Sequence, residues 1–414
     1  MSGKYYTKFR HYLLYGIALL IPVSRKGVLL LLLLYGLNWL ILQNYKEKFN
    51  LLKQRLGKIL IFSSLYIIYA LSLLWSSNLR AGLFDLQVKL SLFLIPFILF
   101  SEKVTDKSVR ENVFKSYIAG CIITVCYCFI NSLIQYTQTH AIESFVYIRF
   151  SVLFHPTYFS LFLNFAIVLI FFMYFSSYKH KRSETIIYGL LILIFSASIV
   201  LANSKAVLIT LFITYLSAAL YYGYRKNRIK ESVIISVLLV SGMAVLLYHT
   251  PQINNRLKDS KRIINEYLHN EKLRDNEGTA QRILVWRSSI KIIKEYLYTG
   301  VGAGDVKDML MEDYMANHYK NIVEKKLNSH NQYLQTMVAL GIPGVLFLLM
   351  ILFYPLILNR RNTNYLQLMF VIITAINFLT ESMLETQAGV VFFAFFNTYL
   401  FTEYFIILPA RKNP

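Results

Sequence analysis

The residues with the clearest capacity for chemistry lie where a polar run meets an apolar one. His330, Asn331 and Gln332 directly precede an apolar stretch at 333–358. An imidazole has an unperturbed pKa of about 6.5 and can therefore accept a proton near neutral pH. His330 is accordingly the first candidate for a catalytic base, with Asn331 as a supporting neighbour.

Two glycines follow His330 at a fixed spacing. The pattern is His-Asn, nine residues, then Gly-x-x-Gly, which consists of Gly341 and Gly344. Glycines on a helix allow a second helix to approach closely. At 1.5 Å per residue, His330 would stand about 16 Å from Gly341. The pattern predicts a rigid, closely packed helix that holds a titratable group at the mouth of a cleft.

Three further residues with a charge or an imidazole stand near the ends of apolar stretches, where charges are costly and are functional candidates. Lys205, in LANSKAVL, begins one stretch; the alternative is that it only extends to the membrane interface. Arg149 and His155, in YIRFSVLFHPTY, precede another stretch. For these two, a role as interfacial anchors, with Pro156 beginning a helix, is at least as well supported as a role in ligand binding.

Four other charged residues receive a structural interpretation. Asp85 and Lys89 are spaced i, i+4 within one apolar stretch. They are expected to form a buried ion pair that holds helices together, because an unpaired charge there would be costly. Glu381 and Glu385 lie in a short polar turn, where acidic surface residues need no functional explanation.

These candidates must be positioned by a membrane protein. Of the 414 residues, 56% are hydrophobic and only 16% are charged, against about 25% charged in soluble domains. We predict an all-α integral membrane protein with about 12 transmembrane helices. The first stretch is short and contains Pro22, so eleven spans are the alternative. The apolar stretches are 12–23, 27–42, 59–75, 82–100, 117–134, 157–175, 186–201, 206–222, 233–248, 333–358, 365–379 and 390–408.

The net charge of +21 arises from 43 Lys and Arg against 22 Asp and Glu. With a cytoplasmic amino terminus, basic residues gather in the short cytoplasmic turns, as the positive-inside rule expects, and long loops are exempt from that rule. The basic residues do not line one face, as they would in a nucleic-acid-binding surface. The charge therefore predicts topology and contact with membrane lipids, and it predicts no binding of nucleic acid.

One long insertion interrupts the apolar stretches. The predicted organisation is transmembrane helices 1–9 in residues 1–249, a periplasmic loop at 250–329, and transmembrane helices 10–12 in residues 330–414. Within the loop, residues 281–297 have apolar side chains at helical spacing and basic side chains on other faces. This predicts an amphipathic helix on the membrane surface or capping the bundle. Its apolar residues are Ile283, Trp286, Ile290, Ile293 and Leu297.

The segment GVGAG begins at Gly300, directly after this predicted helix. Glycine is a common residue at the carboxyl end of a helix. A dinucleotide-binding glycine motif must instead follow a strand and open a helix. GVGAG therefore marks the end of the helix and predicts no dinucleotide cofactor.

Together these features resemble the O-antigen ligase and polymerase superfamily of bacterial envelope glycosyltransferases. The features are the stretch HNQYLQTMVALGIPG, the large loop before it, an RxxxW element formed by Arg282 and Trp286, the GVGAG after it, and the number of apolar stretches. The resemblance extends over most of the chain. Its specific part is the histidine-to-glycine pattern at a loop-to-helix junction.

The resemblance implies a GT-C type membrane fold and a glycan carried on undecaprenyl diphosphate as the donor. It also implies transfer at the periplasmic face of the bacterial inner membrane without a metal or another cofactor. His330 corresponds to the family's essential histidine and Arg282 to its loop arginine. A second basic position, usually an arginine, is Lys205 in this chain. Lysine keeps the charge but loses bidentate contacts with phosphate.

Physical reasoning from the residues is consistent with this site. A lipid diphosphate carries negative charge at the membrane surface, which Arg282, Lys205 and Arg149 could bind and stabilise as it leaves. No acidic pair has the spacing of metal ligands, and no DxD occurs. His330 could accept the proton of an attacking sugar hydroxyl.

Three functions are considered. An O-antigen ligase would join the lipid-carried glycan to an acceptor, for which lipid A-core oligosaccharide is the expected choice. A polymerase would extend the glycan on its lipid carrier by the same chemistry. A lipid-linked glycan flippase or transporter would need paired charges near the middle of several spans, and Asp85 with Lys89 is the one clear pair in the sequence.

Overall fold

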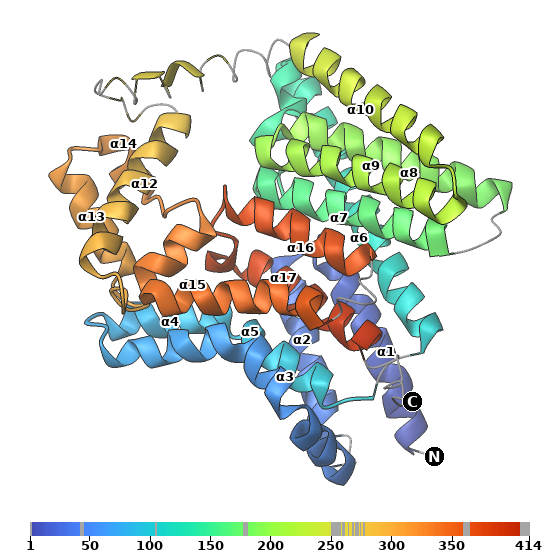
Figure 1. The fold of residues 1–414 in the computed structure, drawn as a ribbon, viewed down its shortest axis with the longest axis horizontal. Coiled ribbons are helices and arrows are strands. Elements are labelled where there is room, and N and C mark those ends of the chain that lie inside the picture. The colour runs from blue at the N-terminus through green and yellow to red at the C-terminus, as the bar shows by residue number, and fades with distance from the viewer. Residues whose placement is uncertain are drawn as a thin grey trace.

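The computed structural model describes residues 2–41, 45–103, 106–176, 181–249, 278–358 and 365–405, and several positions between 258 and 275. Over these residues the chain is helical and contains no strand (Figure 1). The amino-terminal part forms α1 (Ser2–Leu20), α2 (Arg25–Ile41), α3 (Tyr45–Leu71), α4 (Leu79–Lys89), α5 (Ser91–Phe100), α6 (Lys107–Thr139), α7 (Pro156–Ser176), α8 (Arg182–Ala202), α9 (Lys205–Lys226) and α10 (Ile229–His249). The remainder forms α12 (Gly278–Glu295), α13 (Val306–Ala316), α14 (Lys320–Lys325), α15 (Gln332–Leu358), α16 (Tyr365–Phe378) and α17 (Gln387–Phe405).

Each of the twelve predicted apolar stretches overlaps one of these helices, and α4 with α5 share one stretch. Within the described residues, 7 helical segments are long and apolar enough to cross a membrane, and two shorter apolar helices lie at 365–378 and 387–402. These findings confirm an all-α protein with membrane-spanning helices. The count of about 12 spans and the GT-C type of the fold stay predictions.

Helix α7 lies at the centre of the bundle. It packs against α6, α8, α9 and α16, and every residue from Pro156 to Ile170 is buried. A helix that is apolar on all sides is stable only when it is buried on all sides. The ring of Phe165 packs against the rings of Phe370, Phe392 and Phe396 from α16 and α17. The carboxy-terminal helices therefore complete the core that the amino-terminal half begins.

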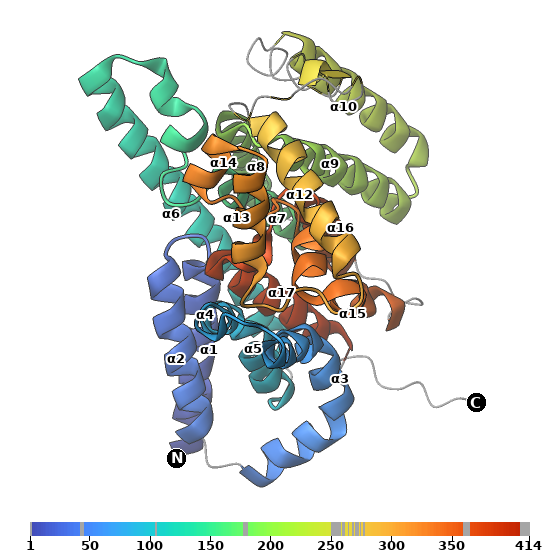
Figure 2. The same ribbon diagram turned by 90° about the vertical axis from the view of Figure 1, so that its left-hand side faces the viewer.

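The insertion between α10 and α15 contains a helical cap. Helices α12, α13 and α14 lie together beside one end of α15, as both views of the ribbon show (Figures 1 and 2). Helix α12 confirms the predicted amphipathic helix, but the predicted apolar face was wrong in part. Ile290 is exposed and Trp286 is only partly buried, whereas Leu284, Val285, Ser288, Ser289 and Ile292 are buried.

The buried face of α12 is rotated because the helix packs on α15 through small and polar residues as well as apolar ones. The Ser289 hydroxyl also lies 2.9 Å from the hydroxyl of Ser329, three residues before α15 begins. Helical periodicity identified the element. It could not identify a buried face that carries two serines, since apolar character alone defined the expected face.

Helix α15 is broken at Gly341, which has φ 63° and ψ −157°. The backbone N–H of Ile342 donates to the Leu297 carbonyl at 2.9 Å, and the N–H groups of Val301 and Gly302 donate to carbonyls of α15. The predicted close approach at Gly341 is present, but the prediction of a rigid helix approached by another helix was wrong in part, because the helix is interrupted there and the segment against it is a connection. Glycine is needed here because the segment 297–302 lies against the opened helix, where a side chain would collide with backbone.

Replacing Gly341 with alanine should lower the stability of the protein by about 1–3 kcal/mol or more. A Cβ atom would lie 2.6 Å from the Leu297 carbonyl oxygen, and φ is in the region that side chains rarely adopt. Gly189→Ala in α8 is the matched control, because a Cβ there meets nothing within 4 Å. Thermal unfolding in detergent measures both variants. Equal melting temperatures for the two would contradict this account of the break.

Candidate active site

A cavity of about 490 Å³ lies where four helices begin. The helices are α7, α9, α12 and α15, and most of the lining consists of their first residues or of residues just before them; Tyr147 and Thr380 come from other connections. The amino-terminal end of a helix carries partial positive charge and free N–H groups, so this arrangement favours an anion. The lining residues are Tyr147, His155, Pro156, Thr157, Asn203, Ser204, Lys205, Ala206, Gly278, Thr279, Gln281, Arg282, Leu327, His330 and Thr380.

His330 is held by bonds from the residues around it. Its φ is 43°, a left-handed conformation, and its N–H donates to the Asn328 side chain at 3.0 Å. Just before it, the N–H of Ser329 donates to the Gln335 side chain at 3.1 Å, and the Ser329 hydroxyl contacts Ser289 of α12. A non-glycine residue with positive φ is uncommon and points to a functional constraint. These contacts fix the imidazole at the cavity wall.

The two residues after His330 connect α15 to the turn between α16 and α17. The Asn331 side chain caps α15 by accepting the N–H of Leu334 at 3.1 Å. The Asn331 N–H donates to the Ser382 hydroxyl at 3.1 Å, and the Gln332 side chain accepts the N–H of Leu384 at 2.6 Å. The polar stretch at the membrane edge thus positions His330 and holds the 380–386 turn against it.

That turn brings Glu381 to the histidine. One carboxylate oxygen of Glu381 lies 3.5 Å from Nδ1 of His330, and the glutamate is only 6% exposed. Nδ1 faces the carboxylate at ion-pair distance without a hydrogen bond among the described residues, and Nε2 is the ring nitrogen left for a substrate. A carboxylate in this position orients an imidazole and stabilises its protonated form. The sequence interpretation of Glu381 as an ordinary surface acid was wrong.

Burial alone would raise the pKa of Glu381, but the neighbouring His330, His155 and Arg282 outweigh it and hold the pKa below its usual value. A carboxylate whose pKa is lowered by folding stabilises the folded protein at pH values above the ordinary glutamate pKa of about 4.3. This stabilisation is lost as the pH falls through the lowered pKa.

A Glu381→Gln variant should therefore lose less stability on acidification than the wild type, because it lacks this carboxylate. We expect the difference between the two melting temperatures to shrink between about pH 6 and pH 3. Thermal unfolding at a series of pH values measures it. A constant difference across that range would show that the charge of Glu381 contributes no stability.

A second imidazole, that of His155, lines the same cavity. Burial lowers its pKa, and the nearby His330 and Arg282 lower it further, against the opposing effect of Glu381. The lowered pKa favours the neutral form of the His155 imidazole. Its Nδ1 is buried without a hydrogen-bond partner among the described residues. A buried polar atom of this kind needs an explanation, and a bound substrate group is one.

Two of the three predicted basic residues line the cavity. Lys205 opens α9 directly after a tight turn in which Asn203 adopts φ 50°, and Arg282 lies in the first turns of α12. Arg149 does not line it: this residue is exposed at the end of a short helical turn, from which Tyr147 reaches the cavity instead.

The remaining predicted residues lie outside the lining. Trp286 is one turn after Arg282, partly buried, and its indole N–H has no hydrogen-bond partner among the described residues. Gly341 and Gly344 lie further along α15 and serve its packing. Across the part of the chain that the structure describes, no group of three or more His, Cys, Asp or Glu could hold a metal ion.

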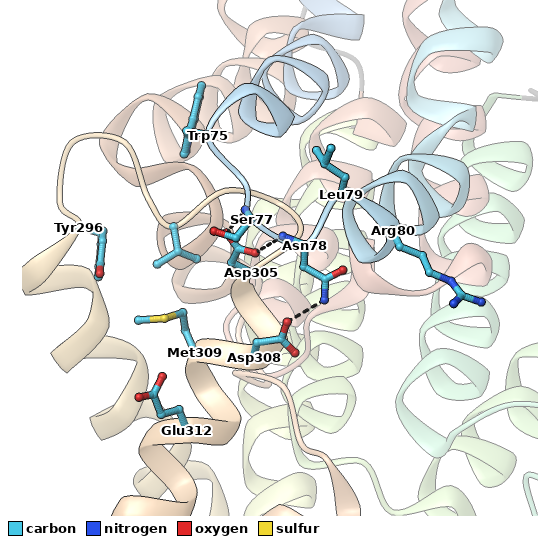
Figure 3. Close-up of a pocket in the computed structure, with 11 residues that line it drawn as sticks. Trp75, Ser77, Asn78, Leu79, Arg80, Tyr296, Asp305, Asp308, Met309 and Glu312 are labelled. Atoms are coloured by element: carbon cyan, nitrogen blue, oxygen red, sulfur yellow. Dashed lines mark hydrogen bonds between the residues drawn. The ribbon is translucent and has the colours of Figure 1, made fainter.

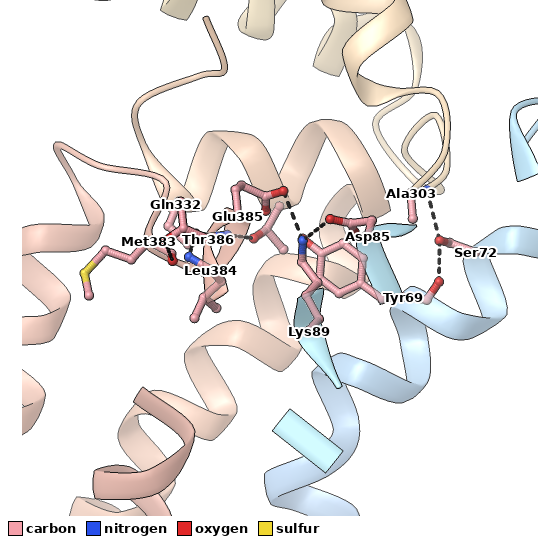
Figure 4. Close-up of polar contacts among 11 residues, drawn as sticks. Tyr69, Ser72, Asp85, Lys89, Ala303, Gln332, Met383, Leu384, Glu385 and Thr386 are labelled. Atoms are coloured by element: carbon pink, nitrogen blue, oxygen red, sulfur yellow. Dashed lines mark hydrogen bonds and ion pairs between the residues drawn. The ribbon is translucent and has the colours of Figure 1, made fainter. Parts of the chain in front are cut away.

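The predicted pair of Asp85 and Lys89 is present and has a third member. Lys89 is 0% exposed, and its ammonium group bonds to Asp85 and, at 3.0 Å, to Glu385 (Figure 4). The ammonium also lies 4.6 Å from the centre of the Tyr69 ring. Glu385 belongs to the same turn as Glu381. The ion cluster thus connects α4 to the turn that contacts His330, a connection that the sequence spacing did not indicate.

Comparison with known families is consistent with this geometry. Residues 189–349 match the family model described as O-antigen ligase. No curated protein matches the chain. The matched region contains Lys205, Arg282 and His330, all three of which line the cavity. Members of this family are glycosyltransferase-like ligases and polymerases that act on lipid-linked glycans in membranes. The match over residues 189–349 supports an assignment to the O-antigen ligase and polymerase family.

Proposed function

We propose that this protein is an O-antigen ligase-like glycosyltransferase. It moves a glycan from undecaprenyl diphosphate to an acceptor, with lipid A-core oligosaccharide as the expected one, at the periplasmic face of the inner membrane. The observation that carries the proposal is the convergence of four helix amino-terminal ends, two basic side chains and two imidazoles on a single cavity.

The charge of the cavity fits a diphosphate. Lys205 and Arg282 add full positive charges to the partial charges of the helix ends. As the bond between the sugar and the diphosphate breaks, negative charge builds on the leaving oxygen, and donors already in place stabilise it. Lysine at position 205 would contact a phosphate as a point charge, and Arg282 can form paired hydrogen bonds. These cations would supply, without a metal, the charge stabilisation that a metal supplies elsewhere.

His330 would act as the base. Its Nε2 accepts the proton of the acceptor hydroxyl while that oxygen forms a bond to the anomeric carbon and the diphosphate departs. Glu381 at Nδ1 stabilises the imidazolium that results. The neutral imidazole of His155 is left to accept or donate a hydrogen bond to a sugar hydroxyl. Each of these groups comes from a different connection between helices.

A purified-component assay tests the proposal. The full chain in lipid nanodiscs is supplied with undecaprenyl-diphosphate glycan and lipid A-core, without ATP and with a chelator of divalent metals. We expect glycan-bearing lipid A-core as the product. Glycan lengthened on its carrier, formed without use of lipid A-core, would identify a polymerase instead. Consumption of neither substrate, by protein that is folded, would contradict both.

A further inference from the structure

A second and larger cavity, of about 730 Å³, lies at the other end of α12 (Figure 3). Its walls come from the turn between α3 and α4, the first residues of α4, the segment that connects α12 to α13, and α13 itself. The apolar part of the lining includes the rings of Trp75 and Tyr296, which are 44% and 41% exposed. In Figure 3, Met309 and Glu312 extend from α13 toward Tyr296, and Trp75 lies at the opposite end from Glu312.

The wall of this cavity is rigid. The Asp305 carboxylate accepts the backbone N–H groups of Ser77 and Asn78, both at 2.7 Å. The Asn78 side chain donates to Asp308 at 2.8 Å. Gly304 packs so closely on the Asn78 carbonyl that a Cβ would lie 2.2 Å from its oxygen. The cavity is therefore formed before any ligand arrives, which lowers the entropy cost of binding.

The chemistry of the lining suits a sugar. Exposed aromatic faces provide flat apolar surfaces against which the C–H faces of sugar rings can pack, and carboxylate and amide groups accept and donate hydrogen bonds to hydroxyls. Asp308 and Glu312 give the cavity negative charge. Arg80 is the one basic residue in the described lining, and its guanidinium points away from the other side chains in Figure 3. An anionic lipid headgroup or a diphosphate would be repelled here.

Helix α12 connects the two cavities. Arg282 in its first turns lines the candidate active site, and Tyr296, directly after its last residue, lines the second cavity. The two positions are 296 − 282 = 14 residues apart, which is about 21 Å along a helix. A glycan of several sugars whose reacting end is in the first cavity could therefore reach the second.

We propose that the second cavity is a carbohydrate subsite, which binds uncharged or amino sugars of a glycan whose reacting end lies beside His330. This inference rests on the proposed function for its substrate class. It assigns Trp75 and Tyr296 as stacking residues and Glu312 as a hydrogen-bond acceptor. None of these residues belongs to the first cavity.

Binding of carrier-free sugar tests the subsite separately from catalysis. One probe is the oligosaccharide released from the donor lipid by mild acid, and the other is the core oligosaccharide freed from lipid A. Each is titrated calorimetrically into the full chain in zwitterionic nanodiscs. We expect Trp75→Ala and Tyr296→Ala to weaken binding of at least one probe by about ten-fold. The probe that is affected identifies the donor or the acceptor as the source of the glycan.

Three variants provide controls. Tyr298→Ala removes a ring that is 75% exposed and does not line the cavity, so its affinity should equal that of the wild type. Trp75→Phe keeps an aromatic face and should restore most of the affinity. His318→Ala, which alters the lining of neither cavity, should bind the probes normally even if the protein proves not to be a transferase. Equal affinities for Trp75→Ala, Tyr296→Ala and the wild type would overturn the proposal. Binding of phosphatidylglycerol vesicles without binding of either oligosaccharide would also overturn it.

Discussion

Replacing His330 with alanine is expected to lower the rate of glycan transfer by about 10²- to 10⁴-fold. The imidazole lines the cavity and contacts Glu381, so the change removes both the base and the partner of a buried carboxylate. Lys205 and Arg282, which would bind the donor, are unaffected. The rate at saturating donor should therefore fall while the apparent affinity for donor changes little, and the purified-component assay measures both.

His318→Ala is the matched control for this experiment. His318 lies in the same insertion, is exposed, and does not line the cavity. Its replacement should leave the rate unchanged. A His330→Ala protein with normal thermal stability and a wild-type rate would eliminate the histidine as the base.

Glu381→Gln offers a second comparison at the same site. If the glutamate acts through the imidazole, Glu381→Gln should slow transfer when His330 is present. The same replacement should have little further effect on the rate of His330→Ala, because the effects of residues that act as a unit do not add. Independent, additive losses would instead mean that Glu381 contacts a substrate itself.

The helices could be predicted from the sequence. In a membrane, the backbone N–H and C=O groups of a long apolar stretch can form their hydrogen bonds only within a helix. The sequence was also sufficient to select His330 and Lys205 as candidates, because charged or titratable groups at the ends of such stretches are costly. Arg282 was selected from the resemblance to the family alone. Their convergence on one cavity could not be predicted, since α9, α12 and α15 are separated by long connections. Only the packing of these helices brings the three residues to one place.

Glu381 shows why part of the site could not be predicted. A glutamate in a polar turn between two apolar helices has the sequence pattern of a solvated surface residue. It is buried because Ser382 and Leu384 form hydrogen bonds with Asn331 and Gln332. Those bonds join positions about 50 residues apart, and no local pattern encodes them. The break of α15 at Gly341 was missed for the same reason, because its partner segment precedes α15 in a different part of the fold.

Replacing Lys89 with methionine should destabilise the protein by about 3–5 kcal/mol. The ammonium group is 0% exposed and is shared by the carboxylates of Asp85 and Glu385, which would be left buried without their cation. Methionine preserves much of the volume of the side chain, so the loss reports charge rather than packing. Chemical or thermal unfolding of the variant in detergent measures the change.

Two controls separate this buried cluster from ordinary ion pairs. Lys107→Ala removes a pair with Glu111 in which the lysine is 75% exposed, and it should change stability little. A triple variant, Asp85→Asn with Lys89→Met and Glu385→Gln, removes all three charges and should recover much of the lost stability, because no unpaired charge then remains buried. A Lys89→Met protein as stable as the wild type would mean that the carboxylates find other partners. If instead the triple variant is stable but transfers glycan slowly, the cluster has a role beyond stability: it holds the turn of Glu385, and with it Glu381, at the position that His330 requires.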